Sequence, residues 1–93
     1  MVWRATARDD RRRITAWLAE RNPAAAVRIT RALLAAADSL AVLPEKGRPG
    51  LVPGTRELSA VPPYVIVYEV ERETRLVRIL RVWHTAQARG SGE

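Results

Sequence analysis

The chain has no cysteine, one histidine and no long apolar run in its 93 residues. Without cysteine it can form neither a disulfide nor a thiolate metal site, so packing must stabilise the fold, as suits a reducing compartment. The first eight residues lack the apolar core of a signal peptide, and no stretch is long enough to cross a bilayer. We therefore expect a soluble, cytoplasmic protein without a membrane partner. The sequence shows no metal or cofactor motif, and we expect neither group.

Negative charge is also scarce: ten Asp and Glu face sixteen Lys and Arg, which gives a net charge of +6. Every cation except Lys46 is an arginine, and the planar arginine fork suits carboxylate and phosphate. An acidic partner, either protein or nucleic acid, fits this balance. The composition has a second explanation, since a GC-rich genome favours arginine and alanine codons whatever the function.

Two stretches have helical periodicity. Residues 2–6 alternate like a short strand, and an amphipathic helix follows over 7–21, in which Trp17 is expected in the core. Asn22 and Pro23 then form a helix start, because Asn caps orphan amides and Pro at the first position loses no needed hydrogen bond. The second helix runs to about Val42 and stops before Pro44. The pair predicts a helical hairpin.

The second half reads as a sheet. Gly and Pro are too dense over 45–54 for a regular helix or a central strand, so we expect a loop whose glycines permit tight turns. Strand-like runs follow over 55–61, 64–70 and 76–83, and the last is apolar on both faces, which is typical of a central strand. We predict an α+β fold, ordered β-α-α-β-β-β, with an N-terminal helical hairpin packed on a small, mainly antiparallel sheet. Residues 1–86 would form the domain and 87–93 a flexible tail.

Three motifs in this order, GRPGLVPGTREL, YVIVYEV and VRILRVWH, resemble the RelE/ParE superfamily of type II toxin–antitoxin systems over about residues 2–86. The resemblance implies a small basic toxin, involved in plasmid stabilization, in a hetero-oligomer with a cognate antitoxin that wraps it. Operator DNA would be bound only through the antitoxin.

The branch of the superfamily decides the activity. RelE-like members cut mRNA on the ribosome, typically with an arginine where this chain has Val65 and with a terminal tyrosine that the segment 85–88 lacks. These departures favour the ParE-like branch, whose members inhibit DNA gyrase by binding and are not themselves enzymes. Two alternatives remain: an mRNA endoribonuclease that uses Arg56, Arg81 and His84, and an inactive module that only binds its antitoxin.

The residues that we expect to contact a target or a partner lie in the glycine-rich loop and the last two long strands. For each of them a structural role is the competing interpretation, since arginines pair on the surface and half-buried tyrosines are usual in sheets. The arginines at the start of the first predicted helix are likewise either a nucleic-acid footprint or a solvated face. The candidate contact residues are Arg48, Arg56, Tyr64, Tyr68, Arg81, Trp83 and His84.

Overall fold

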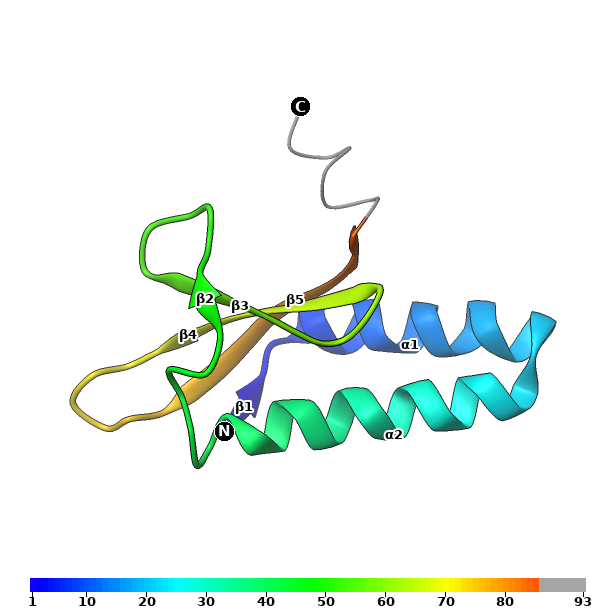
Figure 1. The fold of residues 1–93 in the computed structure, drawn as a ribbon, viewed down its shortest axis with the longest axis horizontal. Helices are drawn as coiled ribbons and strands as arrows, with labels where there is room; N and C mark the ends of the chain where they lie inside the picture. The colour runs from blue at the N-terminus through cyan, green and yellow to red at the C-terminus, as the bar shows by residue number, and fades with distance from the viewer. Residues whose placement is uncertain (86–93) are drawn as a thin grey trace.

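The computed structural model describes residues 1–85, so the expected tail 87–93 lies outside the described residues. Two helices and five strands form two layers (Figure 1). The elements are β1 (Val2–Trp3), α1 (Ala5–Arg21), α2 (Pro23–Ser39), β2 (Arg48–Pro49), β3 (Thr55–Val61), β4 (Tyr64–Val70) and β5 (Val77–His84). The predicted α+β architecture is confirmed.

The helical hairpin is the N-terminal layer. Asn22 ends α1 and caps α2, because its side-chain oxygen accepts a hydrogen bond of 3.1 Å from the Ala25 amide, and Pro23 occupies the first turn as expected. Thr15 and Thr30 share a hydrogen bond of 2.6 Å that fixes the two helices side by side. The second helix ends at Ser39, three residues before the predicted end, and turns lead on to Pro44.

The sheet has the strand order β1-β5-β4-β3-β2. Its long strands are antiparallel neighbours, whereas β1 runs parallel to β5, with Val2 opposite Arg78 and Trp3 opposite Ile79. The last long strand therefore lies inside the sheet, as its apolar pattern predicts. The sequence did not reveal β2, a two-residue edge strand that Arg48 and Pro49 form against β3.

An irregularity in β5 explains how this strand faces the core. Val67 pairs with Arg81 and Tyr68 with Ile79, so Leu80 is an extra residue with no cross-strand partner on β4. The bulge reverses the alternation of side chains along β5. Ile79 and Val82 consequently both lie in the buried core, although their spacing of three would place them on opposite faces of a regular strand.

The core lies between the helices and one face of the sheet. Packing of α1 on β5 and of α2 on β3 covers this face, while the turn between the helices projects beyond the sheet (Figure 1). This projection corrects one expectation: Trp17, in the C-terminal part of α1, is 54% exposed rather than buried, because that end of the hairpin extends past the sheet. The buried residues that hold the layers together are Ala7, Leu33, Ala37, Leu40, Leu58, Tyr64, Ile66, Tyr68, Val77, Ile79 and Val82.

Neither helix combines the length and the apolarity needed to cross a membrane, as judged over residues 1–85.

Candidate functional site

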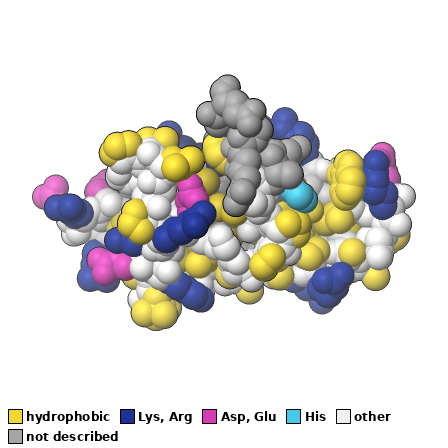
Figure 2. All heavy atoms as spheres, turned by 45° about the horizontal axis from the view of Figure 1, so that its top comes forward, with side chains coloured by type: hydrophobic (Ala, Val, Ile, Leu, Met, Phe, Trp, Pro, Cys, Tyr) yellow, Lys and Arg dark blue, Asp and Glu magenta, His cyan; other side chains and the backbone are white. Residues whose placement is uncertain are grey.

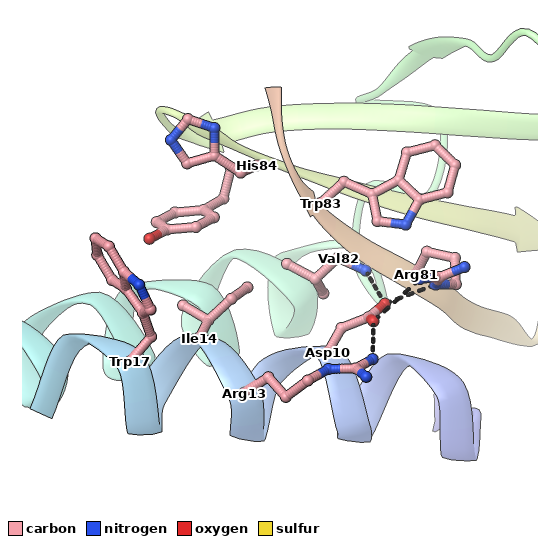
Figure 3. Close-up of a pocket in the computed structure, with 9 residues that line it drawn as sticks. Asp10, Arg13, Ile14, Trp17, Arg81, Val82, Trp83 and His84 are labelled. Carbon is pink, nitrogen blue, oxygen red and sulfur yellow. Dashed lines mark hydrogen bonds and ion pairs between the residues drawn. The ribbon is translucent and has the colours of Figure 1, made fainter. Parts of the chain in front are cut away.

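An open groove of about 830 Å³ lies between the sheet-facing side of α1 and the end of β5 (Figure 3). Four aromatic side chains, two arginines and one carboxylate surround it, together with two aliphatic residues. The lining consists of Asp10, Arg13, Ile14, Trp17, Tyr64, Arg81, Val82, Trp83 and His84.

The groove exists because β1 is short. β1 pairs with β5 only as far as Ile79, and the chain then turns into α1 with the Arg4 amide donating to the Ile79 carbonyl at 2.9 Å. Polar groups of β5 beyond this point need other partners, since an unpaired buried amide or carbonyl is costly. Thr6 and Asp10, one helical turn apart, supply them: Thr6 Oγ1 donates to the Leu80 carbonyl at 3.0 Å, and Asp10 Oδ2 accepts from the Val82 amide at 3.0 Å.

Asp10 is the most constrained polar residue of the groove. It is only 5% exposed, and Arg81 grips it with two bonds, Nε to Oδ2 at 2.7 Å and NH2 to Oδ1 at 3.2 Å. Arg13 adds a bond of 3.0 Å to Oδ1. Burial alone would raise the pKa of Asp10, but the bonds from Arg81, Val82 and Arg13 and the charge of Arg81 outweigh burial and lower that pKa. The carboxylate is therefore ionised at neutral pH and holds Arg81 in one orientation.

Aromatic rings form the rest of the wall. Tyr64 and His84, cross-strand partners on β4 and β5, meet edge to face with ring centroids 5.6 Å apart. Trp17 approaches them from α1 (Figure 3), and the guanidinium of Arg21 covers its ring at 3.9 Å. Arg81 in turn lies 5.1 Å from the ring of Trp83. Rings stacked with cations offer large contact area at low entropic cost, which is typical of surfaces that bind another macromolecule.

The structure divides the seven candidate residues between two places. Tyr64, Arg81, Trp83 and His84 meet in the groove. Arg48, Arg56 and Tyr68 lie outside its lining, toward the loop before β3. The alternative catalytic set of Arg56, Arg81 and His84 is therefore not gathered in one cavity, since Arg56 lines a separate one.

Tyr68 and Arg56 shape the loop instead of facing the groove. The fully buried Tyr68 hydroxyl donates to the Pro44 carbonyl at 2.7 Å and accepts from the Gly47 amide at 2.9 Å. Arg56 NH1 donates to the Gly47 carbonyl at 2.7 Å, and Arg48 NH2 pairs with Glu57 at 3.1 Å. A Cβ on Gly47 would lie 2.7 Å from the Tyr68 hydroxyl, so glycine is needed here for close approach rather than for a positive φ. This position of Tyr68 supports the structural interpretation over base stacking.

Sequence reasoning missed the contribution of α1 to the groove. Asp10, Ile14 and Trp17 follow one another at helical spacing, which places a carboxylate within the apolar stripe of the helix. A charged residue on a core-facing stripe needs a buried partner, and this was the available signal. Arg13, one of the arginines interpreted as either a nucleic-acid footprint or a solvated face, has a 73% exposed side chain and also lines the groove.

The described residues include no group of three or more His, Asp or Glu side chains placed to hold a metal ion. The single carboxylate of the groove is already bonded to two arginines.

Two antiparallel helices on a mixed five-stranded sheet, with an open aromatic and cationic groove, define a small basic α+β domain. A family model described as the ParE toxin of the type II toxin–antitoxin system, parDE, matches residues 1–89. The chain belongs to this family and is the toxin of a type II toxin–antitoxin pair, so an antitoxin partner is expected.

Curated relatives agree with this assignment. The chain is 46% identical over 87 residues to "Toxin RelE2" of Caulobacter vibrioides and covers 92% of each sequence. It is 40% identical over 87 residues to "Toxin RelE1" of the same organism, with 89% of each covered. A solved structure titled "Chromosomal ParDE TA system from P. aeruginosa" superposes with a TM-score of 0.77 over 89% of this chain and 91% of that chain, at 23% identity. This last likeness concerns the fold alone.

Proposed function

We propose that this toxin acts in the cytoplasm by binding and inhibiting DNA gyrase, and that its antitoxin neutralises it by occupying the groove between α1 and β5. The observation that carries the first part is the state of Arg81. A ribonuclease needs cations free to stabilise the charge that develops on a scissile phosphate. Here the guanidinium of Arg81 is bonded through two nitrogens to Asp10, an acceptor that a phosphate would have to displace.

Two further features favour inhibition by binding over cleavage. The β4 position at which nuclease members typically carry an arginine is Val65, a buried aliphatic residue opposite Trp83. Arg56 lines a different cavity from Arg81 and His84. The family description, the ParE toxin of parDE, agrees with the ParE-like branch.

The groove suits an antitoxin segment with both acidic and apolar side chains. Its rim carries the exposed guanidinium of Arg13, while Trp17 and Ile14 present apolar surface from α1. A segment that binds the folded toxin and not the unfolded chain also stabilises it through mass action.

A ribosome-dependent mRNA endonuclease is the second candidate, because Arg81 and His84 share the groove and the curated relatives are named RelE. Under this alternative His84 would be the general acid or base, and its loss would cost roughly 10²–10⁴-fold in rate.

The variant His84→Gln separates the two candidates in cells. We expect wild-type expression to arrest growth with relaxed plasmid DNA and intact transcripts. His84→Gln should then keep most of its toxicity, because glutamine retains polar contact but cannot exchange protons. Plasmid topology and primer extension on translated mRNA are measured together. Cleaved transcripts with wild type, lost in His84→Gln, would transfer the assignment to the nuclease, and no arrest with either protein would indicate an inactive antitoxin-binding module.

A further inference from the structure

A second cavity, of about 550 Å³, lies at the opposite end of the sheet and shares no lining residue with the groove. Residues of the β2–β3 loop, of the segment before β2 and of the β4–β5 turn line it, and these segments lie at the same end of the sheet (Figure 1). It is lined by Pro44, Glu45, Pro49, Gly54, Thr55, Arg56, Val70, Arg72 and Arg75. We propose that this cavity and its apolar rim form a docking site for a protein segment that alternates acidic and apolar side chains.

Two of the cavity's three arginines carry positive charge that the fold does not use. Three arginines line the cavity against one carboxylate, Glu45. Arg72 and Arg75 form no ion pair or hydrogen bond with any residue of the described range 1–85. The neighbouring carboxylate of Glu71 is turned away, because it accepts from Arg78 at 2.7 Å and from Thr74 at 2.8 Å. Two guanidinium groups are thus available to a ligand with carboxylates.

The backbone of Arg75 gives independent support. Its φ is +57°, a left-handed conformation that glycine or asparagine adopts at lower cost than arginine. The turn imposes this conformation through the bond of 2.9 Å from the Glu71 amide to the Leu76 carbonyl. Glycine would adopt this conformation at lower cost, so the turn carries the arginine side chain at some cost in backbone strain.

Exposed aliphatic side chains surround the arginines. Leu51 is 89% exposed and Val52 is 64% exposed at the tip of the β2–β3 loop, and Leu43, 58% exposed, precedes the cavity residue Pro44. The tip is held in shape, since the Gly50 amide donates to the Thr55 carbonyl at 2.8 Å and Thr55 Oγ1 to the Val52 carbonyl at 2.6 Å. Figure 2 shows hydrophobic and basic side chains next to one another at this end of the molecule.

This combination favours a protein over a nucleic acid. Single-stranded nucleic acids need aromatic rings on which bases stack, and the cavity lining contains none. Aliphatic residues around a cationic centre instead match a peptide whose carboxylates reach Arg72 and Arg75 while its apolar side chains cover Leu51 and Val52. The proposal does not depend on which target the toxin inhibits, because gyrase takes no part in its test.

The test uses the full chain, labelled with ¹⁵N, and a fluorescent peptide about twelve residues long in which glutamate and leucine alternate. Fluorescence anisotropy gives the affinity, and amide chemical shifts locate the site. We expect the peptide to shift the amides of Leu51, Val52 and Arg75 and to leave those of Trp17 and Trp83 in place. A peptide with lysine for glutamate and a single-stranded oligonucleotide of similar length serve as comparison ligands.

Two variants remove the charges, and a third is the matched control. Arg72→Ala and Arg75→Gly should each weaken peptide binding about tenfold, the cost of one charge-assisted contact. Arg75→Gly should at the same time raise the melting temperature, because glycine relieves the left-handed strain. Arg12→Ala removes an exposed arginine of α1 that lies outside both cavities, and it should leave binding unchanged.

Binding lost in both cavity variants and kept in Arg12→Ala supports the site. Equal loss in all three variants would reduce the effect to net charge and overturn it. Shifts confined to the groove, or tight binding of the oligonucleotide but not of the acidic peptide, would overturn it as well.

Discussion

Asp10 joins the helix layer to the sheet layer through one carboxylate. It accepts from Arg81, from Arg13 and from the amide of Val82, so it satisfies a backbone donor that β1 is too short to reach. Asp10 also orients Arg81, whose pKa is raised because it donates to this carboxylate. Stability and the geometry of the groove therefore depend on the same side chain.

Replacing Asp10 by Asn should lower the free energy of unfolding at pH 7 by about 2 kcal/mol. The charge-assisted hydrogen bonds weaken, and the new side-chain NH2 group is placed against N–H donors of the groove. Asp9→Asn is the control, since Asp9 is exposed on the same helix and its substitution removes the same charge. Urea unfolding measures both variants. If Asp9→Asn and Asp10→Asn cost the same, the loss comes from general charge and the role assigned to Asp10 fails.

Acid should erase the difference between wild type and Asp10→Asn. The pKa of Asp10 is lowered on folding, so its stabilisation is present above the unfolded value of about 3.9 and is lost as the pH falls through the folded value. The difference between the two unfolding free energies should therefore begin to shrink below about pH 4. A gap that stays constant down to acid would contradict an ionised, hydrogen-bonded Asp10.

At the scale of elements, the sequence predicts helices and long strands well because each has a local cause. Asn22 and Pro23 mark a helix boundary that the structure confirms, and the long strands β3, β4 and β5 fall within one residue of their predicted bounds. The sequence did not predict β2, because a strand of two residues has no periodic pattern. The sequence predicted only part of the groove. The bulge at Leu80 depends on the pairing of β5 with β4. The ion pair of Asp10 with Arg81 joins residues about seventy positions apart.

The loop before β3 takes its form from a distant element. Tyr68 on β4 holds it through the Pro44 carbonyl and the Gly47 amide, and burial raises the pKa of the tyrosine, so its hydroxyl stays protonated and donates. The strand β2 and the docking site proposed above both follow from this attachment, since Pro44, Pro49 and Arg56 line that cavity.

Tyr68→Phe should cost about 1–3 kcal/mol, because it leaves a buried donor and a buried acceptor unpaired. The amide of Gly47 should also exchange with solvent faster, since its partner is gone. Tyr64→Phe is the matched control: Tyr64 is buried on the same strand, and its hydroxyl has no hydrogen bond within the described residues. Thermal melting and hydrogen exchange test the pair. Unchanged hydrogen exchange at the Gly47 amide in Tyr68→Phe would show that the Tyr68 hydroxyl does not hold this loop.

The net charge and the shape of the whole molecule are those of a protein that acts by binding other macromolecules. A net charge of +6 on 93 residues, an open groove at one end and an arginine-lined cavity at the other leave two separate surfaces for partners. Membership in the toxin family implies an antitoxin partner. The ion pair of Arg81 with Asp10 favours the proposed inhibition of gyrase over cleavage of mRNA.

The most direct measurement is supercoiling of relaxed plasmid by purified DNA gyrase in the presence of the full chain, scored for lost supercoiling and for linear DNA trapped on the enzyme. We predict inhibition that rises with toxin concentration and disappears when the cognate antitoxin is added first. Full supercoiling at toxin concentrations that stop growth in cells would contradict the proposed function.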